Sequence, residues 1–338
     1  MSYLRKNIIL IKYYMIIKKI DNLILHKFEN ASFIGGNNIR VVLDSNNKIQ
    51  NLKPLKRDKN IEEVSNINTE IYLANIFLFT DHWGDKNINH WFIEQFPVLL
   101  FLFELIIQFP DIKIILNKNR RESVKNNIKE VLFLVPGVKE ENIYEIEIKN
   151  PWFTSIKSDN IFIGDAMRCG PYKIIKYWNL VCSKSDIVNN IKATNKKEFS
   201  KKIYLSRRIT DTNSRVLTNI EEVSKVIVEK GYQEVFMENL SINDKIYLFN
   251  NCSDIITELG AGMINFIFCN NNTNLIVLMQ ESNKEFYTNF FKPIILQKNM
   301  NVKIIYGETI HNKNHKGHRV NTPWKLSLDE MLLNLVTS

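Results

Sequence analysis

The feature that most constrains the fold is a regular alternation of short apolar segments and amphipathic segments in the second half of the chain. Strand-like runs at 202–206, 232–237, 254–257, 274–279 and 302–306 alternate with segments of helical spacing at 219–231, 241–251, 263–269 and 283–298. Strands that alternate with helices form parallel βαβ units, in which each helix crosses back over the sheet. The pattern therefore predicts a doubly wound α/β domain.

Two of the helical segments also carry signals at their ends. Asn219 stands where a helix cap is expected, and Gly231 stands where the same helix should stop. Ser241 precedes the next helical segment and is followed by Asp244 at the spacing of a capping box. The caps and the apolar spacing thus agree on where these helices begin.

The first half of the chain is less regular. The apolar stretch 88–109 predicts a buried helix that is interrupted near Pro97, because proline breaks the helical hydrogen-bond pattern. Further segments predict strands at 7–17, 39–43, 72–79, 112–116 and 143–148, and helices at 120–134 and 172–198.

A chain of 338 residues exceeds the usual size of one hydrophobic core, so we expect two domains. The polar, Lys-rich segment 192–202 favours a boundary that separates a domain at 1–198 from one at 199–322. Residues 323–338 read as a final helix, with Ser327 and Glu330 at capping-box spacing. One alternative is that this helix packs back on the N-terminal domain.

The formal net charge of +9 fits a nucleic acid, an anionic membrane or a phosphate-bearing ligand as partner. The lysines are scattered, however, so a solvated basic surface is the favoured interpretation. Cys169, Cys182, Cys252 and Cys269 have no zinc-ligand spacing, which favours free thiols in a reducing compartment. Lys12 interrupts the apolar N-terminal stretch, and no signal-peptide cleavage site follows it. We therefore expect a soluble, cytoplasmic protein with no membrane span.

Two glycines, Gly260 and Gly262, follow the strand-like run 254–257 in a chain that has only 11 glycines. A strand, a tight glycine turn and a helix are how parallel sheets approach a phosphate, because the helix start offers N–H donors. The same turn also suits close packing of a helix against a strand. The motif alone leaves both interpretations open.

Three stretches in order carry a more specific signal: "NINHWFIEQFPVLL" (87–100), "IYLSRRITDTNSRVLTNIEEV" (203–223) and "DIITELGAGMINFIF" (254–268). Together they resemble glycosyltransferase family 61, and the resemblance covers about residues 70 to 335. It implies a GT-B-like α/β fold, with two Rossmann-like domains facing across a cleft. It also implies inverting transfer of a hexose or pentose from a UDP-sugar, without a cofactor, to an acceptor hydroxyl on a protein or glycan.

The resemblance implies that the N-terminal domain serves the acceptor and that the C-terminal domain binds the nucleotide-sugar. Arginine is a bidentate partner for phosphate oxygens, which suits the cluster after the strand at 202–206. The donor-binding candidates are Arg207, Arg208, Arg215, Glu238, Gly260, Ala261, Gly262 and Asn265. For the arginine pair the alternative is a solvated loop, and for Glu238 an exposed loop carboxylate is the favoured interpretation.

The family's turn has histidine before Gly-Ala-Gly, whereas this chain has Leu259 there, preceded by Glu258. Glu258 is thus one candidate for catalysis. The others are His90 and Glu94, which share a helix face, so that His90 would act as the base and Glu94 would orient it. A buried, hydrogen-bonded His90 is the structural alternative.

The chain has no Asp-x-Asp sequence, so we expect no metal site and neutralisation of the diphosphate by arginines and a helix start. The histidines at 311, 315 and 318 read as part of a polar loop. Two other functions remain as alternatives. One is a nucleotide-sugar-binding protein with an altered catalytic site, suggested by Leu259. The other is a basic nucleic-acid-binding protein, for which the sequence lacks a basic patch with interleaved aromatic residues.

Overall fold

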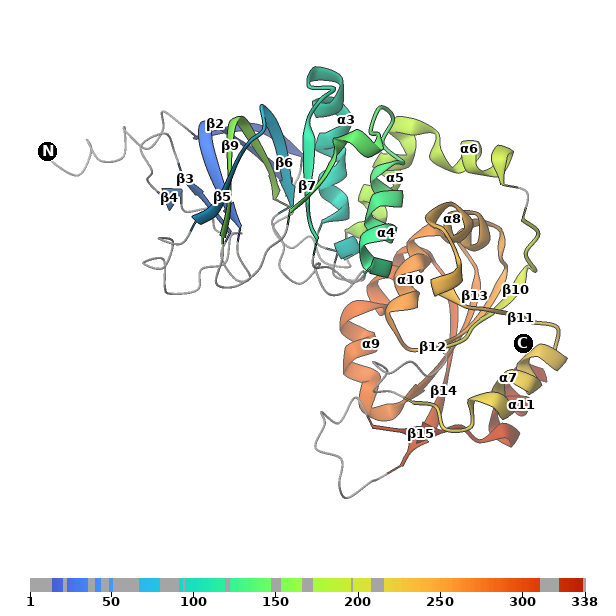
Figure 1. Cartoon of the computed structure of the whole chain (residues 1–338). Helices are drawn as coiled ribbons and strands as arrows, with labels where there is room; N and C mark the ends of the chain where they lie inside the picture. The colour runs from blue at the N-terminus through green and yellow to red at the C-terminus, as the bar shows by residue number, and fades with distance from the viewer. Residues whose placement is uncertain are drawn as a thin grey trace, which may run out of the picture. The chain divides into compact units, whose positions relative to one another are not determined.

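A computed structural model describes most of the chain. The described residues are 14–20, 23–35, 40–43, 49–50, 67–79, 91–93, 95–118, 122–146, 153–165, 173–195, 197–207, 216–310 and 322–336. The chain divides into two compact units, Met1–Gly170 with Asn179–Ser185 and Pro171–Trp178 with Asp186–Ser338 (Figure 1). This division falls ahead of residue 198, where the Lys-rich segment suggested the boundary.

The first unit is built on a mixed sheet in the order β4-β3-β2-β9-β6-β7-β8, with β1 paired to β2 and β5 paired to β9. Its strands are β1 (Tyr14–Ile20), β2 (Leu23–Gly35), β3 (Arg40–Leu43), β4 (Ile49–Gln50), β5 (Ile67–Tyr72), β6 (Asn75–Phe79), β7 (Lys113–Asn117), β8 (Ile143–Ile146) and β9 (Phe153–Asp165). The β5, β6, β7, β8 and β9 strands run parallel. The β1 to β4 strands extend the sheet with antiparallel pairs.

The two longest strands of this sheet, β2 and β9, were not predicted from the sequence. They pair antiparallel over most of their length, from Ile24 opposite Asp165 to Gly35 opposite Thr154. Polar residues interrupt the apolar ones along both strands: in β9, Lys157 and Asp159 are exposed, whereas Ile161, Phe162 and Ile163 are all buried. A half-buried strand has a weaker apolar signal than the continuous runs that parallel strands show.

Within the apolar stretch 88–109, the described residues 91–93 and 96–108 are helical and mostly buried, as predicted. A short 3₁₀ helix, η3 (Phe96–Val98), has Pro97 in its first turn and leads directly into α3 (Leu99–Gln108). The interruption near Pro97 is therefore confirmed. The buried side chains of α3 include Leu99, Leu102 and Ile106.

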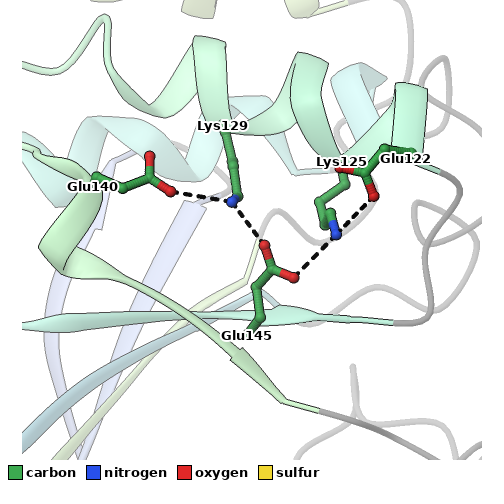
Figure 2. Close-up of polar contacts among 5 residues, drawn as sticks. All are labelled: Glu122, Lys125, Lys129, Glu140 and Glu145. Atoms are coloured by element: carbon green, nitrogen blue, oxygen red, sulfur yellow. Dashed lines mark hydrogen bonds and ion pairs between the residues drawn. The ribbon is translucent and has the colours of Figure 1, made fainter.

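A charged cluster ties helix α4 (Glu122–Leu132) to β8 and to the short helix η4 (Glu140–Asn142). Figure 2 shows Glu145 of β8 between two lysines of α4. The distance from Glu145 to the ammonium nitrogen is 2.7 Å for Lys129 and 3.1 Å for Lys125. Lys125 also pairs with Glu122 at 2.9 Å, and Lys129 with Glu140 at 3.2 Å.

The second unit confirms the alternation read from the sequence. Its sheet has the order β11-β10-β12-β13-β14-β15. The strands are β10 (Lys202–Leu205), β11 (Gln233–Val235), β12 (Asp254–Glu258), β13 (Asn274–Gln280), β14 (Asn301–Thr309) and β15 (Trp324–Lys325). All but β15 run parallel.

The helices between and beside these strands occupy the segments that the sequence predicted as helical. They are α5 (Ile174–Ser185), which spans both units, α6 (Ile187–Thr194), α7 (Ile220–Glu229), α8 (Ile242–Asn251), α9 (Lys284–Phe290), α10 (Lys292–Gln297) and α11 (Leu328–Val336). The described residues of this unit also form the 3₁₀ helices η5 (Met237–Asn239), η6 (Ala261–Phe268) and η7 (Glu281–Asn283). Ser241 and Asp244 form the predicted capping box of α8.

The order of the parallel strands has a functional consequence. Across the sheet the parallel strands stand in the order β11-β10-β12-β13-β14. The chain goes from β10 to β11 in one direction and then returns to β12 on the other side of β10, so the direction of winding reverses between β10 and β12. Ligands of doubly wound sheets bind in the crevice at the carboxyl ends of the two strands where this reversal occurs. The carboxyl ends of β10 and β12 are therefore where a ligand is expected.

Asn219 does not cap α7 with its side chain, contrary to the expectation from the sequence. Its Nδ2 instead donates to the Leu326 carbonyl at 2.9 Å, and its Oδ1 accepts from the Leu326 N–H at 3.1 Å. This clamp holds the segment before α11 against the second unit. Met331 of α11 joins the core cluster that contains Val223 and Ile227 of α7, and Figure 1 shows the two helices side by side.

The described part of the C-terminal helix thus contributes to the core of the second unit. In the part of the chain that the structure describes, no helix is both long and apolar enough to cross a lipid bilayer.

Candidate functional site

Two predicted site residues lie at the carboxyl ends of β10 and β12, where the winding of the sheet reverses. Arg207 follows β10 after Ser206, and Glu258 is the last residue of β12. The two strands pair directly, with Leu205 opposite Thr257. Neighbouring parallel strands end at the same edge of the sheet, so segments 51 positions apart in sequence come together there.

Glu258 is a buried carboxylate, with 3% of its surface exposed. Its Oε1 accepts a hydrogen bond from the Tyr204 hydroxyl and another from the Arg207 backbone N–H, each at 3.1 Å. Burial raises the pKa of Glu258 from 4.5 to about 7, although the hydrogen bond and the charge of Arg207 oppose the shift. Glu258 thus changes charge close to neutral pH.

The Arg207 side chain extends over the start of the glycine turn. Its Nη1 donates to the Leu259 carbonyl at 2.8 Å. Burial lowers the pKa of Arg207 and the charge of Glu258 opposes this, but arginine stays protonated at any physiological pH. The site therefore holds a fixed positive charge at the carboxyl edge of the sheet.

The close contact between Arg207 and the turn explains why residue 260 is glycine. A β-carbon on Gly260 would lie 2.8 Å from Nη1 of Arg207 and 3.0 Å from its Cζ. Real β-carbons essentially never approach other atoms that closely, so a side chain at this position would displace the guanidinium. At Gly262 the nearest atom to such a β-carbon, Cγ of Met237, lies at an ordinary 3.5 Å.

The segment after the turn is a 3₁₀ helix, η6, where the sequence suggested an α-helix. The first turn of any helix leaves backbone N–H groups without an intrahelical acceptor, so Ala261 and Gly262 stand where an anion is favoured. Asn265 is buried within this helix. Its Nδ2 donates to the Gly262 carbonyl at 2.8 Å and contacts Sδ of Met237 at 3.7 Å, which indicates that it braces the turn.

A small cavity of about 10 Å³, at the lower limit for one water molecule, lies beside Arg207 and Glu258. Its other lining residues are Leu259, Leu278, Met279, Gln280, Asn283 and Trp324. Gln280 is fully buried at the end of β13, where its Nε2 donates to the Thr322 carbonyl at 2.6 Å. Oδ1 of Asn283 is also buried, and it has no hydrogen-bond partner among the described residues.

Gln280, Asn283 and Trp324 were not predicted from the sequence as residues of this site. One signal was present, because Gln280 is a polar residue at the end of the apolar run 274–279. Trp324 carried no such signal, because its place in the site depends on β15 pairing with β14.

The structure brings together Arg207, Glu258 and Gly260, with Ala261, Gly262 and Asn265 in the helix that follows. Glu238 lies on η5 after β11 and is exposed, as favoured from the sequence. Four predicted residues lie outside the described part of the chain: His90, Glu94, Arg208 and Arg215. Among the described residues, no group of three or more His, Cys, Asp or Glu side chains is arranged to hold a metal ion.

Comparison with known proteins adds one finding. The model of the family described as Glycosyltransferase 61 matches residues 88–276, more than half of the chain. A comparison with curated proteins found no match. The matched region begins next to His90, includes Arg207 and Glu258, and ends within β13. The chain therefore belongs to the glycosyltransferase 61 family, and it is a glycosyltransferase.

Proposed function

We propose that the enzyme transfers a sugar, with inversion, from a UDP-sugar to an acceptor hydroxyl, and that the second unit binds the donor. The observation that carries the proposal is the Arg207 guanidinium held against the Gly260–Gly262 turn at the carboxyl ends of β10 and β12. Strand order, positive charge and a helix start coincide at this point. Each of the three favours a bound diphosphate.

The chemistry of the leaving group supports the same assignment. Sugar transfer leaves a nucleoside diphosphate, whose negative charge increases as the bond to the sugar breaks. Arg207 offers a permanent charge, and the N–H groups at the start of η6 offer fixed dipoles, so both stabilise that charge without rearrangement. We therefore propose that turnover needs no divalent metal, and that saturating EDTA leaves the rate within about twofold, roughly 0.4 kcal/mol in barrier.

The contacts of Glu258 support a positioning role. Oε1 of Glu258 accepts hydrogen bonds from the Arg207 backbone N–H and from the Tyr204 hydroxyl. The carboxylate thus fixes the end of β10, from which the Arg207 guanidinium extends. For the base that takes the acceptor's proton, the prediction remains His90, oriented by Glu94. The acceptor is proposed to be a hydroxyl on a protein or glycan.

The test is UDP binding by calorimetry to the wild type, Arg207→Ala and Lys201→Ala. Lys201 is exposed and lies just before β10. The Lys201→Ala substitution therefore removes one positive charge, as Arg207→Ala does, but at the opposite end of the strand. Loss of a charge-assisted hydrogen bond, worth about 1.5–3 kcal/mol, should weaken binding roughly 10- to 100-fold in Arg207→Ala only. Equal UDP affinity in all three folded proteins would refute the placement of the diphosphate.

A further inference from the structure

The Glu258 carboxyl group is buried beside a cation but does not form an ion pair with it. Glu258 is 3% exposed, and both of its hydrogen bonds come from neutral donors, the Tyr204 hydroxyl and the Arg207 backbone N–H. The Arg207 guanidinium donates instead to the Leu259 carbonyl. Burial without an ion pair favours the neutral form of a carboxyl group, because the charged form is poorly solvated there.

We propose that the donor binds to the form of the enzyme in which Glu258 is neutral, so that binding of a UDP-sugar above neutral pH takes up a proton at this carboxyl group. The inference rests on the proposed function, because it takes Arg207 as the diphosphate contact. Glu258 is then a positioning residue that acts through Arg207 and controls donor affinity by its charge.

Arg207 is the charge that Glu258 and the diphosphate share. Burial raises the pKa of Glu258 to about 7, and the hydrogen bond and charge of Arg207 limit that rise. A diphosphate bound at Arg207 offsets the positive charge and repels an ionised carboxylate nearby. Both effects favour the protonated form, so binding should raise the pKa of Glu258 further.

The other described groups around Glu258 do not compete for this proton near neutral pH. Tyr204 on β10 keeps its own proton, because burial raises its pKa well above the usual value. The charge of Glu234 on β11 also raises the pKa of Glu258 and so acts in the same direction. Gln280 and Asn283, which line the cavity beside Glu258, and the aromatic side chain from β15 are neutral.

The neutral form of Glu258 needs an acceptor for its O–H group. Both hydrogen bonds of Glu258 end on Oε1, which leaves Oε2 to carry the proton. The adjoining cavity of about 10 Å³ has space for about one water molecule. Asn283 lines this cavity, and its buried Oδ1 has no partner among the described residues. One water can therefore accept from the carboxyl group and donate to Asn283.

The test is isothermal titration calorimetry of the wild type and Glu258→Gln with UDP, UDP-glucose, UDP-N-acetylglucosamine and UDP-xylose. The tightest-binding UDP-sugar is then titrated between pH 6 and 8. A UDP-sugar keeps a constant charge in this range, whereas the terminal phosphate of UDP ionises near about pH 6. Titrations at pH 7.5 in buffers with different enthalpies of ionisation give the number of protons taken up.

We expect the wild type to take up about 0.7 proton per UDP-sugar at pH 7.5, the fraction of Glu258 that is ionised before binding. Its affinity should be constant below about pH 7, where Glu258 already holds its proton, and about 10-fold weaker at pH 8 than at pH 6. Glu258→Gln should take up no proton, and its affinity should change by less than about twofold over this range.

Two further variants make the test specific. Glu281 is exposed and directly follows β13, so Glu281→Gln removes a carboxylate at the same edge of the sheet and should retain the proton uptake of the wild type. Tyr204→Phe removes a hydrogen bond that lowers the pKa of Glu258, so the fall in affinity should begin at a higher pH. Tyr204→Phe keeps the ring in the core and tests the inference even where Glu258→Gln does not fold.

The outcomes separate the two proposals. No UDP binding by the wild type at any pH would refute the proposed function itself. Binding of a UDP-sugar without proton uptake, and with an affinity that does not depend on pH, would refute only the role of Glu258. Proton uptake that persists in folded Glu258→Gln would also overturn the inference, because another group would then receive the proton.

Discussion

The Arg207 guanidinium lies in the space that a β-carbon on Gly260 would need, with Nη1 2.8 Å from that position. Arg207 also donates to the carbonyl of Leu259, the residue before this glycine. The arginine and the turn are therefore one unit, although 53 positions of sequence separate the two residues. A change at either one should alter the other.

Gly260→Ala should therefore weaken UDP binding by displacing Arg207. We expect a loss of about 10-fold, part of what removal of the charge-assisted contact would cost. Gly262→Ala is the control, because its β-carbon meets only Met237 at an ordinary contact distance. Calorimetric titration of UDP into both variants measures the difference. Equal affinities for the two would contradict the coupling between Arg207 and the turn.

Glu258 should make the stability of the protein depend on pH near neutrality. Burial raises its pKa from 4.5 to about 7, so the folded state holds its proton more tightly than the unfolded state. The stabilisation is complete below about pH 4.5 and is lost as the pH rises to about 7. The raised pKa corresponds to about 3 kcal/mol over this window.

The neutral amide of Glu258→Gln resembles the protonated glutamic acid. This variant should therefore lose the pH dependence of stability that Glu258 causes. Urea unfolding between pH 4.5 and 8 should show the wild type losing stability relative to Glu258→Gln as the pH rises. Tyr204, Arg207 and Glu234 are the neighbouring groups that influence Glu258, and they are present in both proteins. Parallel stability profiles for the two proteins would mean that Glu258 ionises normally.

The cluster around Glu145 should stabilise the first unit (Figure 2). Burial raises the pKa of Glu145, but hydrogen bonds from Lys129 and Lys125 outweigh it and lower the pKa overall. The stabilisation is therefore present above the unfolded pKa of a glutamate and is lost as the pH falls through the lowered value. Glu145 is 22% exposed and Lys125 is 10% exposed, so water screens the pair only in part.

Glu145→Ala should reduce the free energy of unfolding by about 1–3 kcal/mol at pH 7, because it leaves two partly buried lysines without their shared partner. Glu141→Ala removes an exposed carboxylate 3.5 Å from Lys139, where both side chains are about 70% exposed. That control should cost less than about 1 kcal/mol. Similar losses in the two variants, measured by urea unfolding, would show that the cluster is only a surface feature.

His90 remains the predicted base, and one preparation of His90→Ala can decide between its two roles. A general base contributes about 10²- to 10⁴-fold to kcat, so the catalytic role predicts a loss of that size with unchanged UDP affinity. A structural histidine predicts instead a lower melting temperature. A stable variant with wild-type kcat would exclude His90 as the base.

The sequence by itself determined the parallel strands and most helices of the second unit, and two of the motifs in its site. Continuous apolar runs and helix caps predicted β10 to β14 and the helices between them, because strands of a parallel sheet are buried on both faces. The motifs at Arg207 and Gly260 were visible for the same reason, since each of these residues lies two positions after the end of a strand. In the first unit β2 and β9 were not predicted, because polar residues such as Lys157 and Asp159 interrupt their apolar residues.

Only the tertiary structure decided which strand ends meet. The reversal of winding brings β10 beside β12, so that Arg207, Glu258 and Gly260 form one cluster, and local spacing contains no information about strand order. The pairing of β15 with β14 likewise brings Trp324 to the pocket lined by Gln280 and Asn283. The burial that raises the pKa of Glu258 and leaves Asn283 Oδ1 without a partner exists only once these segments pack, because it depends on neighbours that are distant in sequence.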